Sequence, residues 1–103
     1  MAFVKVGTKS DVVPGEVKEF EVNGVSIVVA NLDGAKICAI ANLCTHDNGP
    51  LGEGILANGQ VECPRHGARF DACSGAVKAL PAVRPVKTYA VKVEENDILV
   101  DVG

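Results

Sequence analysis

The sequence predicts an all-β domain, an antiparallel sandwich or small barrel built from short strands. Valine is the commonest of its 103 residues, and β-branched residues favour strands over helices. Turn signals recur at short intervals with short apolar runs between them, which is typical of antiparallel hairpins. No window has convincing helical periodicity. A chain of this length is expected to form one domain.

Three dipeptides predict tight hairpins: Asn23-Gly24, Asp33-Gly34 and Asn58-Gly59. Asn, Asp and Gly tolerate the positive φ that two-residue hairpin loops require. The strands predicted beside these turns cover residues 17–22, 25–30, 35–40 and 60–63. A further turn at 95–97 separates an alternating strand at 89–93 from one at 98–102. Short strands joined in this way imply an antiparallel arrangement.

Two stretches, about 42–56 and 64–85, do not fit the strand pattern. Both are rich in Gly and Pro. Long irregular loops in a compact domain usually carry function. We therefore expect these two loops to carry the functional residues.

Charge and hydropathy exclude several classes of protein. The formal net charge is -3, which lacks the basic footprint of a nucleic-acid binder. No apolar run reaches the roughly 18 residues that span a membrane, and the first residues lack the apolar segment of a secretory signal. We expect a cytoplasmic protein with no membrane or nucleic-acid partner.

One pair of short motifs carries the chemistry. Its halves are Cys44-Thr45-His46 and Cys63-Pro64-Arg65-His66. Each half pairs a thiolate with an imidazole on a short loop, so two such loops side by side can make a four-ligand cage. Thiolate and imidazole together suit zinc or an iron–sulfur centre, and they do not suit magnesium or calcium.

The two halves resemble the Rieske signature, a Cys-x-His box followed by a Cys-x-x-His box. In that family the two cysteines hold one iron and the two histidines hold the other. The resemblance continues beyond the boxes: Gly67, Phe70-Asp71 and Ser74-Gly75 follow as they do in Rieske-type ferredoxins, and Pro81 and Pro85 resemble the proline-bearing loop that covers the cluster.

This resemblance covers essentially the whole chain. It implies a Rieske-type antiparallel β sandwich, a single Rieske domain over 1–103, and a cluster-binding subdomain of two long loops at about 42–85. It also implies one Rieske-type 2Fe–2S cluster, with Cys44, His46, Cys63 and His66 as the cluster-binding and metal-ligating residues.

A zinc-stabilised structural module is an alternative for the same four residues, because Cys2His2 sets are common zinc sites. Zinc spacings usually begin Cys-x2–4-Cys and end His-x3–5-His. The alternating order in this chain matches that spacing poorly, so zinc is the weaker interpretation.

The other two cysteines, Cys38 and Cys73, have less specific interpretations. Cys38 lies in an apolar strand and is expected to be a small core residue. Cys73 lies just beyond the second box and is expected to be a buried thiol. A disulfide between them stays open as an alternative, but the reducing cytosol argues against it.

The sequence favours an electron carrier over an enzyme. His46 and His66 are the only histidines, so none remains for a 2-His-1-carboxylate iron site. No Gly-x-Gly-x-x-Gly motif follows a strand. By resemblance, the chain is the ferredoxin component of a bacterial aromatic-ring-hydroxylating dioxygenase system. It would be a monomer that takes electrons from a nicotinamide-dependent flavoprotein ferredoxin reductase and passes them to the terminal oxygenase. The alternative is the small Rieske-fold subunit of an NADH-dependent nitrite reductase.

The resemblance also implies a low reduction potential. The Rieske proteins of cytochrome bc complexes carry an extra cysteine in each box, where this chain has Gly49 and Arg65. They also carry a Ser and a Tyr hydroxyl near the cluster, where this chain has Ala68 and Phe70. Losing two hydrogen bonds to sulfur lowers the potential. We expect a value near the bottom of the Rieske range of roughly −150 to +300 mV.

For docking, we expect both loops at one end of the domain. The cysteines should lie inside, because exposed thiolates oxidise. The imidazoles should point outward, because each can ligate through one nitrogen and present the other to a partner. The candidate contacts for partners are Asp47, Asn48, Pro50, Arg65 and Pro81.

Overall fold

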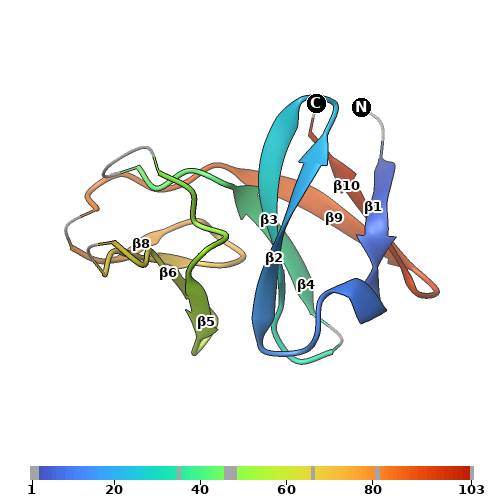
Figure 1. The fold of residues 1–103 in the computed structure, drawn as a ribbon, viewed down its shortest axis with the longest axis horizontal. Helices are drawn as coiled ribbons and strands as arrows, with labels where there is room; N and C mark the ends of the chain where they lie inside the picture. The colour runs from blue at the N-terminus through green and yellow to red at the C-terminus, as the bar shows by residue number, and fades with distance from the viewer. Residues whose placement is uncertain (1–2, 35, 46–48, 66, 81, 103) are drawn as a thin grey trace.

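A computed structural model describes residues 3–34, 36–45, 49–65, 67–80 and 82–102. Within these residues the chain forms two antiparallel sheets (Figure 1). The larger sheet has the order β1-β10-β9-β4-β3-β2 and the smaller has the order β5-β6-β7-β8. The principal extents are 37 × 26 × 19 Å, so the domain is elongated, and the small sheet lies at the end away from both termini (Figure 1).

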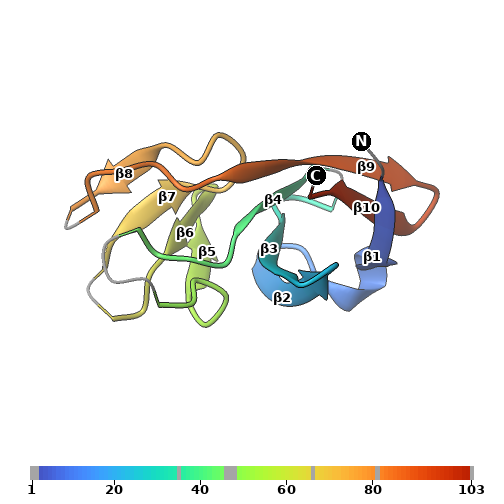
Figure 2. The ribbon, with the colours of Figure 1, turned by 90° about the horizontal axis from the view of Figure 1, so that it is seen from above.

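The large sheet contains the longer strands. They are β1 (Val4–Thr8), β2 (Glu16–Val22), β3 (Val25–Asn31), β4 (Ile37–Ala41), β9 (Thr88–Glu94) and β10 (Asp97–Asp101). A 3-10 turn at Lys9–Asp11 connects β1 to β2. Figure 2 shows that the sheet is strongly curved and that the chain leading into β9 comes from the small sheet.

Two predicted turns are tight hairpins in the structure. Asn23 and Gly24 have φ of 50° and 81° and join β2 to β3, with Val22 paired to Val25. Asn58 and Gly59 have φ of 53° and 74° and form the corresponding loop in the small sheet. These predictions are confirmed, because the local turn chemistry is sufficient to set the register.

The prediction of a tight hairpin at Asp33-Gly34 was wrong. The last β3–β4 pair in the register is Asn31 with Ile37, and the Leu32 N–H still donates to the Lys36 carbonyl at 2.9 Å, so the loop is wider than the two residues Asp33 and Gly34. Of the two turn residues, only Gly34 has a positive φ, 90°. The Asp33 carboxylate accepts the Lys36 N–H at 2.7 Å, and the Asn31 side chain accepts the Gly34 N–H at 2.7 Å. Side chains that accept backbone N–H groups in this way stabilise the wider loop.

The small sheet consists of three-residue strands. They are β5 (Ile55–Ala57), β6 (Gln60–Glu62), β7 (Arg69–Asp71) and β8 (Val77–Ala79). Three of them, β5, β7 and β8, lie inside or at the edge of the stretches that the sequence indicated as irregular. That prediction was wrong at these positions because three residues are too few to show an alternation.

Two apolar cores share β3 and β4. Ile27 and Val29 belong to the core of the large sheet, whereas Val28 and Ala30 belong to a second core with the small sheet. Successive side chains of a strand point to opposite faces, so β3 contributes to both cores and reads as a continuous apolar run. Among the described residues, no helix is long and apolar enough to cross a membrane.

Candidate metal centre

The two predicted ligand loops begin at the ends of two strands. β4 leads through Asn42 and Leu43 to Cys44, and β6 leads directly to Cys63. Each loop is closed by the same hydrogen bond. The Cys44 N–H donates to the Gly49 carbonyl, and the Cys63 N–H donates to the Ala68 carbonyl, both at 2.7 Å. Each cysteine therefore occupies the first position of a loop that returns to it five residues later.

Both cysteines are fully buried and neither is in a disulfide. They belong to the same apolar core as Leu51, Phe70 and Ala82. Two cysteines that are enclosed in one core and lie outside any disulfide fit the cysteine half of a cluster cage, since burial protects a metal-binding thiolate from oxidation. The prediction that the cysteines lie inside is confirmed.

His46 and His66, the two predicted imidazole ligands, lie outside the described residues. The same holds for Asp47, Asn48 and Pro81 among the proposed docking contacts. In the part of the chain that the structure describes, no group of three or more His, Cys, Asp or Glu side chains could hold a metal ion. No competing site of that kind is therefore found in that part.

Arg65 joins the second ligand loop to the first. Its guanidinium donates to the Pro50 carbonyl at 3.0 Å. A Cβ added at Gly49 would lie 2.5 Å from the same guanidinium. Gly49 and Arg65, where the resemblance indicates that a loop-to-loop disulfide is missing, thus lie against each other. A polar contact connects the loops at this point.

The proline-bearing loop is connected to the first ligand loop. The Thr45 hydroxyl donates to the Arg84 carbonyl at 2.7 Å, and the Arg84 guanidinium donates back to the Thr45 carbonyl at 3.3 Å. Ala82 of this loop is buried, whereas Leu80 and Val83 are 75% and 76% exposed. The loop therefore covers the cysteine core with one side and presents two apolar side chains to solvent.

Asn42 anchors the first ligand loop, and the sequence analysis did not identify it. Its side-chain oxygen accepts the N–H groups of Leu51 and Gly52, both at 2.8 Å, and its side-chain nitrogen donates to the Ser26 hydroxyl at 3.0 Å. One amide side chain thus connects both ends of the loop to the hairpin between β2 and β3.

Ala68 and Phe70 are both fully buried in the core that contains the two cysteines. Neither side chain has a hydroxyl group. The residues that the resemblance aligns with hydrogen-bond donors therefore contribute only apolar packing beside the cysteines. The low potential stays a prediction.

Asp71 stabilises the turn that follows β7. Its carboxylate accepts the Ser74 N–H at 2.7 Å and the Cys73 N–H at 3.1 Å. The Ser74 N–H is the main reason that the pKa of Asp71 is lowered, with a smaller contribution from Cys73. A carboxylate that accepts backbone N–H groups is stabilised in its charged form.

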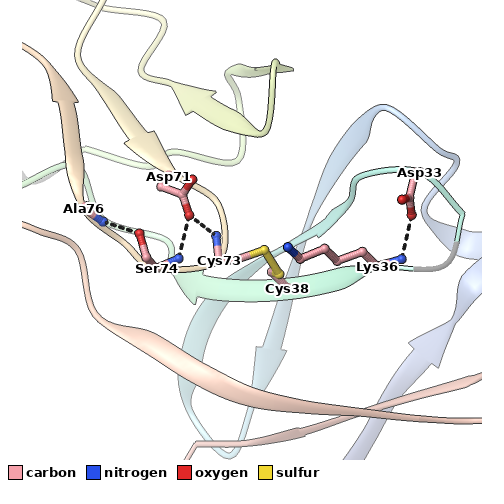
Figure 3. Close-up of a disulfide and its surroundings, with 7 residues drawn as sticks. All are labelled: Asp33, Lys36, Cys38, Asp71, Cys73, Ser74 and Ala76. Atoms are coloured by element: carbon pink, nitrogen blue, oxygen red, sulfur yellow. Dashed lines mark hydrogen bonds between the residues drawn. A yellow bond between two sulfur atoms is a disulfide. The ribbon is translucent and has the colours of Figure 1, made fainter.

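The expectation that Cys38 and Cys73 are separate buried thiols was wrong. They form a disulfide with a Cα–Cα distance of 5.1 Å, and both residues are only half-buried (Figure 3). Cys38 lies two residues before Ile40 on β4, and Ile40 packs into the core shared with the small sheet. Alternation along the strand places Cys38 on that same face, where the turn after β7 meets it.

Known proteins resemble this chain over nearly its whole length. The family model described as Rieske [2Fe-2S] domain matches residues 2–90. The ferredoxin component of biphenyl 2,3-dioxygenase from Rhodococcus jostii (strain RHA1) is 41% identical over 101 residues, which is 98% of this chain and 94% of that protein.

Two solved structures have the same fold. The ferredoxin of carbazole 1,9a-dioxygenase from Nocardioides aromaticivorans IC177 has a TM-score of 0.91 and 39% identity, covering 97% of each chain. A chain in the complex of reduced oxygenase and oxidized ferredoxin in carbazole 1,9a-dioxygenase has a TM-score of 0.88 and 30% identity, covering 95% of this chain and 100% of that chain. The chain belongs to the Rieske 2Fe–2S domain family.

Proposed function

We propose that this chain is the ferredoxin component of an aromatic-ring-hydroxylating dioxygenase system. It carries single electrons from a nicotinamide-dependent flavoprotein reductase to a terminal oxygenase. It works as a cytoplasmic monomer, and Cys44, His46, Cys63 and His66 hold its cluster. The observation that carries this proposal is the pair of buried cysteines, neither of them in a disulfide, at equivalent positions of two matched loops.

The similar proteins support the partners in this proposal. The relatives with nearly full mutual coverage are named ferredoxin components of dioxygenases. One similar structure is described as a complex of an oxygenase with its ferredoxin. These names belong to systems for different aromatic compounds, biphenyl and carbazole.

When bound, the cluster supplies one-electron chemistry. The residues of this chain provide the enclosure. Cys44 and Cys63 supply buried thiolates, and Phe70, Leu51 and Ala82 exclude water from them. Ala68 and Phe70 supply no hydroxyl donor, which favours a potential low enough to pass electrons to an oxygenase.

The described parts of the ligand loops lie together at one end of the molecule, as the contact between Arg65 and Pro50 requires. Pro50 and Arg65 are exposed at this end, and so are Leu80 and Val83. Because one face must serve the reductase and the oxygenase in turn, the contact should be small and weak, at the low end of interface sizes.

Stopped-flow mixing of the reduced protein with an oxidised oxygenase tests this function. The proposal predicts second-order reduction of the oxygenase. Arg65→Ala and Asp47→Ala should change the rate and its salt dependence while leaving the potential almost unchanged. Lys92→Ala is the matched control, because Lys92 lies on β9 and pairs with Glu94 at 3.5 Å, away from the ligand loops. Rates unaffected by both loop changes would mean that the electron leaves through another surface.

A further inference from the structure

The Cys38–Cys73 disulfide spans the two parts of the molecule. Cys38 lies on β4 of the large sheet, and Cys73 lies in the turn after β7 of the small sheet (Figure 3). The two residues are separated by 35 positions. The segment between them contains Cys44, His46, Cys63 and His66, so all four proposed ligands lie within one covalently closed loop.

The turn that carries Cys73 is a connecting point of the small sheet. The Ala72 N–H donates to the Gly59 carbonyl at 2.9 Å, which joins the turn to the β5–β6 hairpin. The Val86 N–H donates to the Gly75 carbonyl at 2.9 Å, which joins it to the segment that enters β9. A bridge from β4 to this turn therefore fixes the small sheet against the strand that leads into Cys44.

The position of the bridge also makes it chemically accessible. Both cysteines are half-buried, unlike the fully buried Cys44 and Cys63. Figure 3 shows the side chain of Lys36 extending along the strand toward the bridge, whereas the Asp71 carboxylate lies at the Cys73 backbone. A cation favours a thiolate and a carboxylate disfavours one. We therefore expect Cys38 to be the better leaving group and the Cys73 sulfur to be the one that is attacked.

We propose that Cys38–Cys73 is a thiol-exchange modification site that controls how firmly the chain holds its cluster. The inference rests on the proposed cytosolic function, since disulfides in that compartment are usually transient or redox-sensing. The reactant is a dithiol, either a small molecule or a protein reductant of the kind that keeps cytosolic thiols reduced.

The exchange takes place in two steps. A thiolate of the dithiol bonds to the Cys73 sulfur, the Cys38–Cys73 bond breaks, and Cys38 leaves with the electron pair and takes up a proton. The second thiolate of the dithiol then attacks the mixed disulfide, and Cys73 leaves and takes up a proton. The protein gains two electrons and two protons, and the dithiol is oxidised to its disulfide.

Thiol counting tests the site itself. Holoprotein prepared without reductant is denatured, alkylated and mapped by mass spectrometry, before and after treatment with dithiothreitol. Cys38 and Cys73 should be alkylated only after the treatment with dithiothreitol. Alkylation of both without it would overturn the proposal. This readout involves no oxygenase, so it remains informative even if the proposed electron-transfer partners are wrong.

Measurements of cluster retention test whether the bridge controls how firmly the cluster is held. Loss of visible absorbance in the presence of an iron chelator is followed for the wild type, with and without dithiothreitol, and for the double variant Cys38→Ser/Cys73→Ser. Because a disulfide opposes opening of the loop that it closes, and cluster loss is expected to follow local opening, reducing the bridge should accelerate cluster loss by about tenfold or more. The double variant should lose its cluster quickly without dithiothreitol and should not respond to it.

Two outcomes would overturn the proposal that the bridge controls cluster retention. One is that dithiothreitol accelerates cluster loss equally in the wild type and the double variant, which would mean direct attack on the cluster. The other is that it does not change cluster loss in the wild type once mapping shows the bridge reduced. If the double variant does not fold, the wild-type holoprotein carries the test, with its rate of cluster loss and its thermal midpoint before and after reduction of the bridge as the readouts.

Discussion

The large sheet and the small sheet are stabilised in different ways. The large sheet has strands of five to seven residues and a core made of aliphatic side chains. The small sheet has three-residue strands, and its core contains Cys44 and Cys63. Strands this short bury too little area to be stable alone. We therefore expect the large sheet to stay folded without the small sheet, whereas the small sheet should depend on its attachments.

These attachments are specific. Asn42, Arg65 and the pair formed by Thr45 and Arg84 connect loops to each other or to the large sheet by hydrogen bonds. The Cys38–Cys73 disulfide adds a covalent link. The bound cluster adds a further link, because metal-binding free energy is also folding free energy where the site does not preexist in the unfolded chain.

Removing a cysteine ligand should have the largest effect. Cys63→Ser should abolish iron and sulfide binding and leave the small sheet disordered, while the large sheet stays folded. Iron and sulfide analysis with amide hydrogen exchange measures both effects. Ile27→Ala is the contrasting variant, because Ile27 is fully buried in the other core. It should lower the global stability by about 2–5 kcal/mol without removing the cluster. If both sheets of Cys63→Ser unfolded together, the claim that the two sheets are stabilised in different ways would be contradicted.

A second large effect is expected at Gly75. Its φ is +76°, and an added Cβ would collide with the Val86 carbonyl oxygen. Gly15 has a similar φ of +88° but has nothing within 4 Å of an added Cβ. Gly15→Ala should cost roughly 1–2 kcal/mol for backbone strain alone. Gly75→Ala should cost a further 1–3 kcal/mol, roughly the overpacking penalty, and should accelerate cluster loss. Equal destabilisation of the two variants in chemical denaturation would refute the proposed close packing at Gly75.

An intermediate effect is expected at Phe70. Phe70→Tyr should raise the reduction potential if the new hydroxyl reaches a ligand sulfur. A differential interaction of about 1 kcal/mol between the two oxidation states corresponds to roughly 40 mV for one electron. Protein-film voltammetry measures the shift, and Phe20→Tyr on β2 of the large sheet is the matched control. An unchanged potential in a Phe70→Tyr structure that contains the hydrogen bond would remove this explanation of the low potential.

The smallest effect should come from the two carboxylates with lowered pKa values. The pKa of Asp71 is lowered mainly by the Ser74 N–H, and that of Asp11 mainly by the Thr8 N–H. A carboxylate with a lowered pKa stabilises the fold above its unfolded pKa, and this contribution is lost as pH falls from about 3.8 through the folded value.

The difference between the wild type and Asp71→Asn should therefore be constant near neutral pH and vanish in acid. Thermal midpoints measured from pH 7 down to acid follow this difference. Asp11→Asn should show the same pH window, but it should leave the rate of cluster loss unchanged because Asp11 lies beside the large sheet. A difference that persists in strong acid would mean that the charge of Asp71 is not the cause.

The fold was predictable where local chemistry determines it. Asn23-Gly24 and Asn58-Gly59 require positive φ, and the structure has it at both. The short strands β7 and β8 were not predictable, because their pairing depends on partners in the folded chain. The loop at Asp33 was also missed, because its width depends on side-chain hydrogen bonds at Asn31 and Asp33.

The site was predictable where a sequence motif identifies its residues. Cys44 and Cys63 could be assigned from their boxes. The contact between Thr45 and Arg84 spans 39 residues, and no local pattern encodes it. The sequence did not favour the disulfide, because thiols stay reduced in the cytosol. Cys38 points to the same face of β4 as Ile40. That face of β4 meets the small sheet only once the two sheets are packed.

Pulsed EPR on the reduced protein tests the central claim most directly, because it reports the ligands of the cluster itself. Protein prepared anaerobically with ¹⁵N-labelled histidine should contain two irons and two sulfides per chain, as the family description implies. Its spectrum should show coupling to two imidazole nitrogens, from His46 and His66. This coupling should change when the label is introduced. Stoichiometric zinc without iron, or a cluster without nitrogen coupling, would contradict the account.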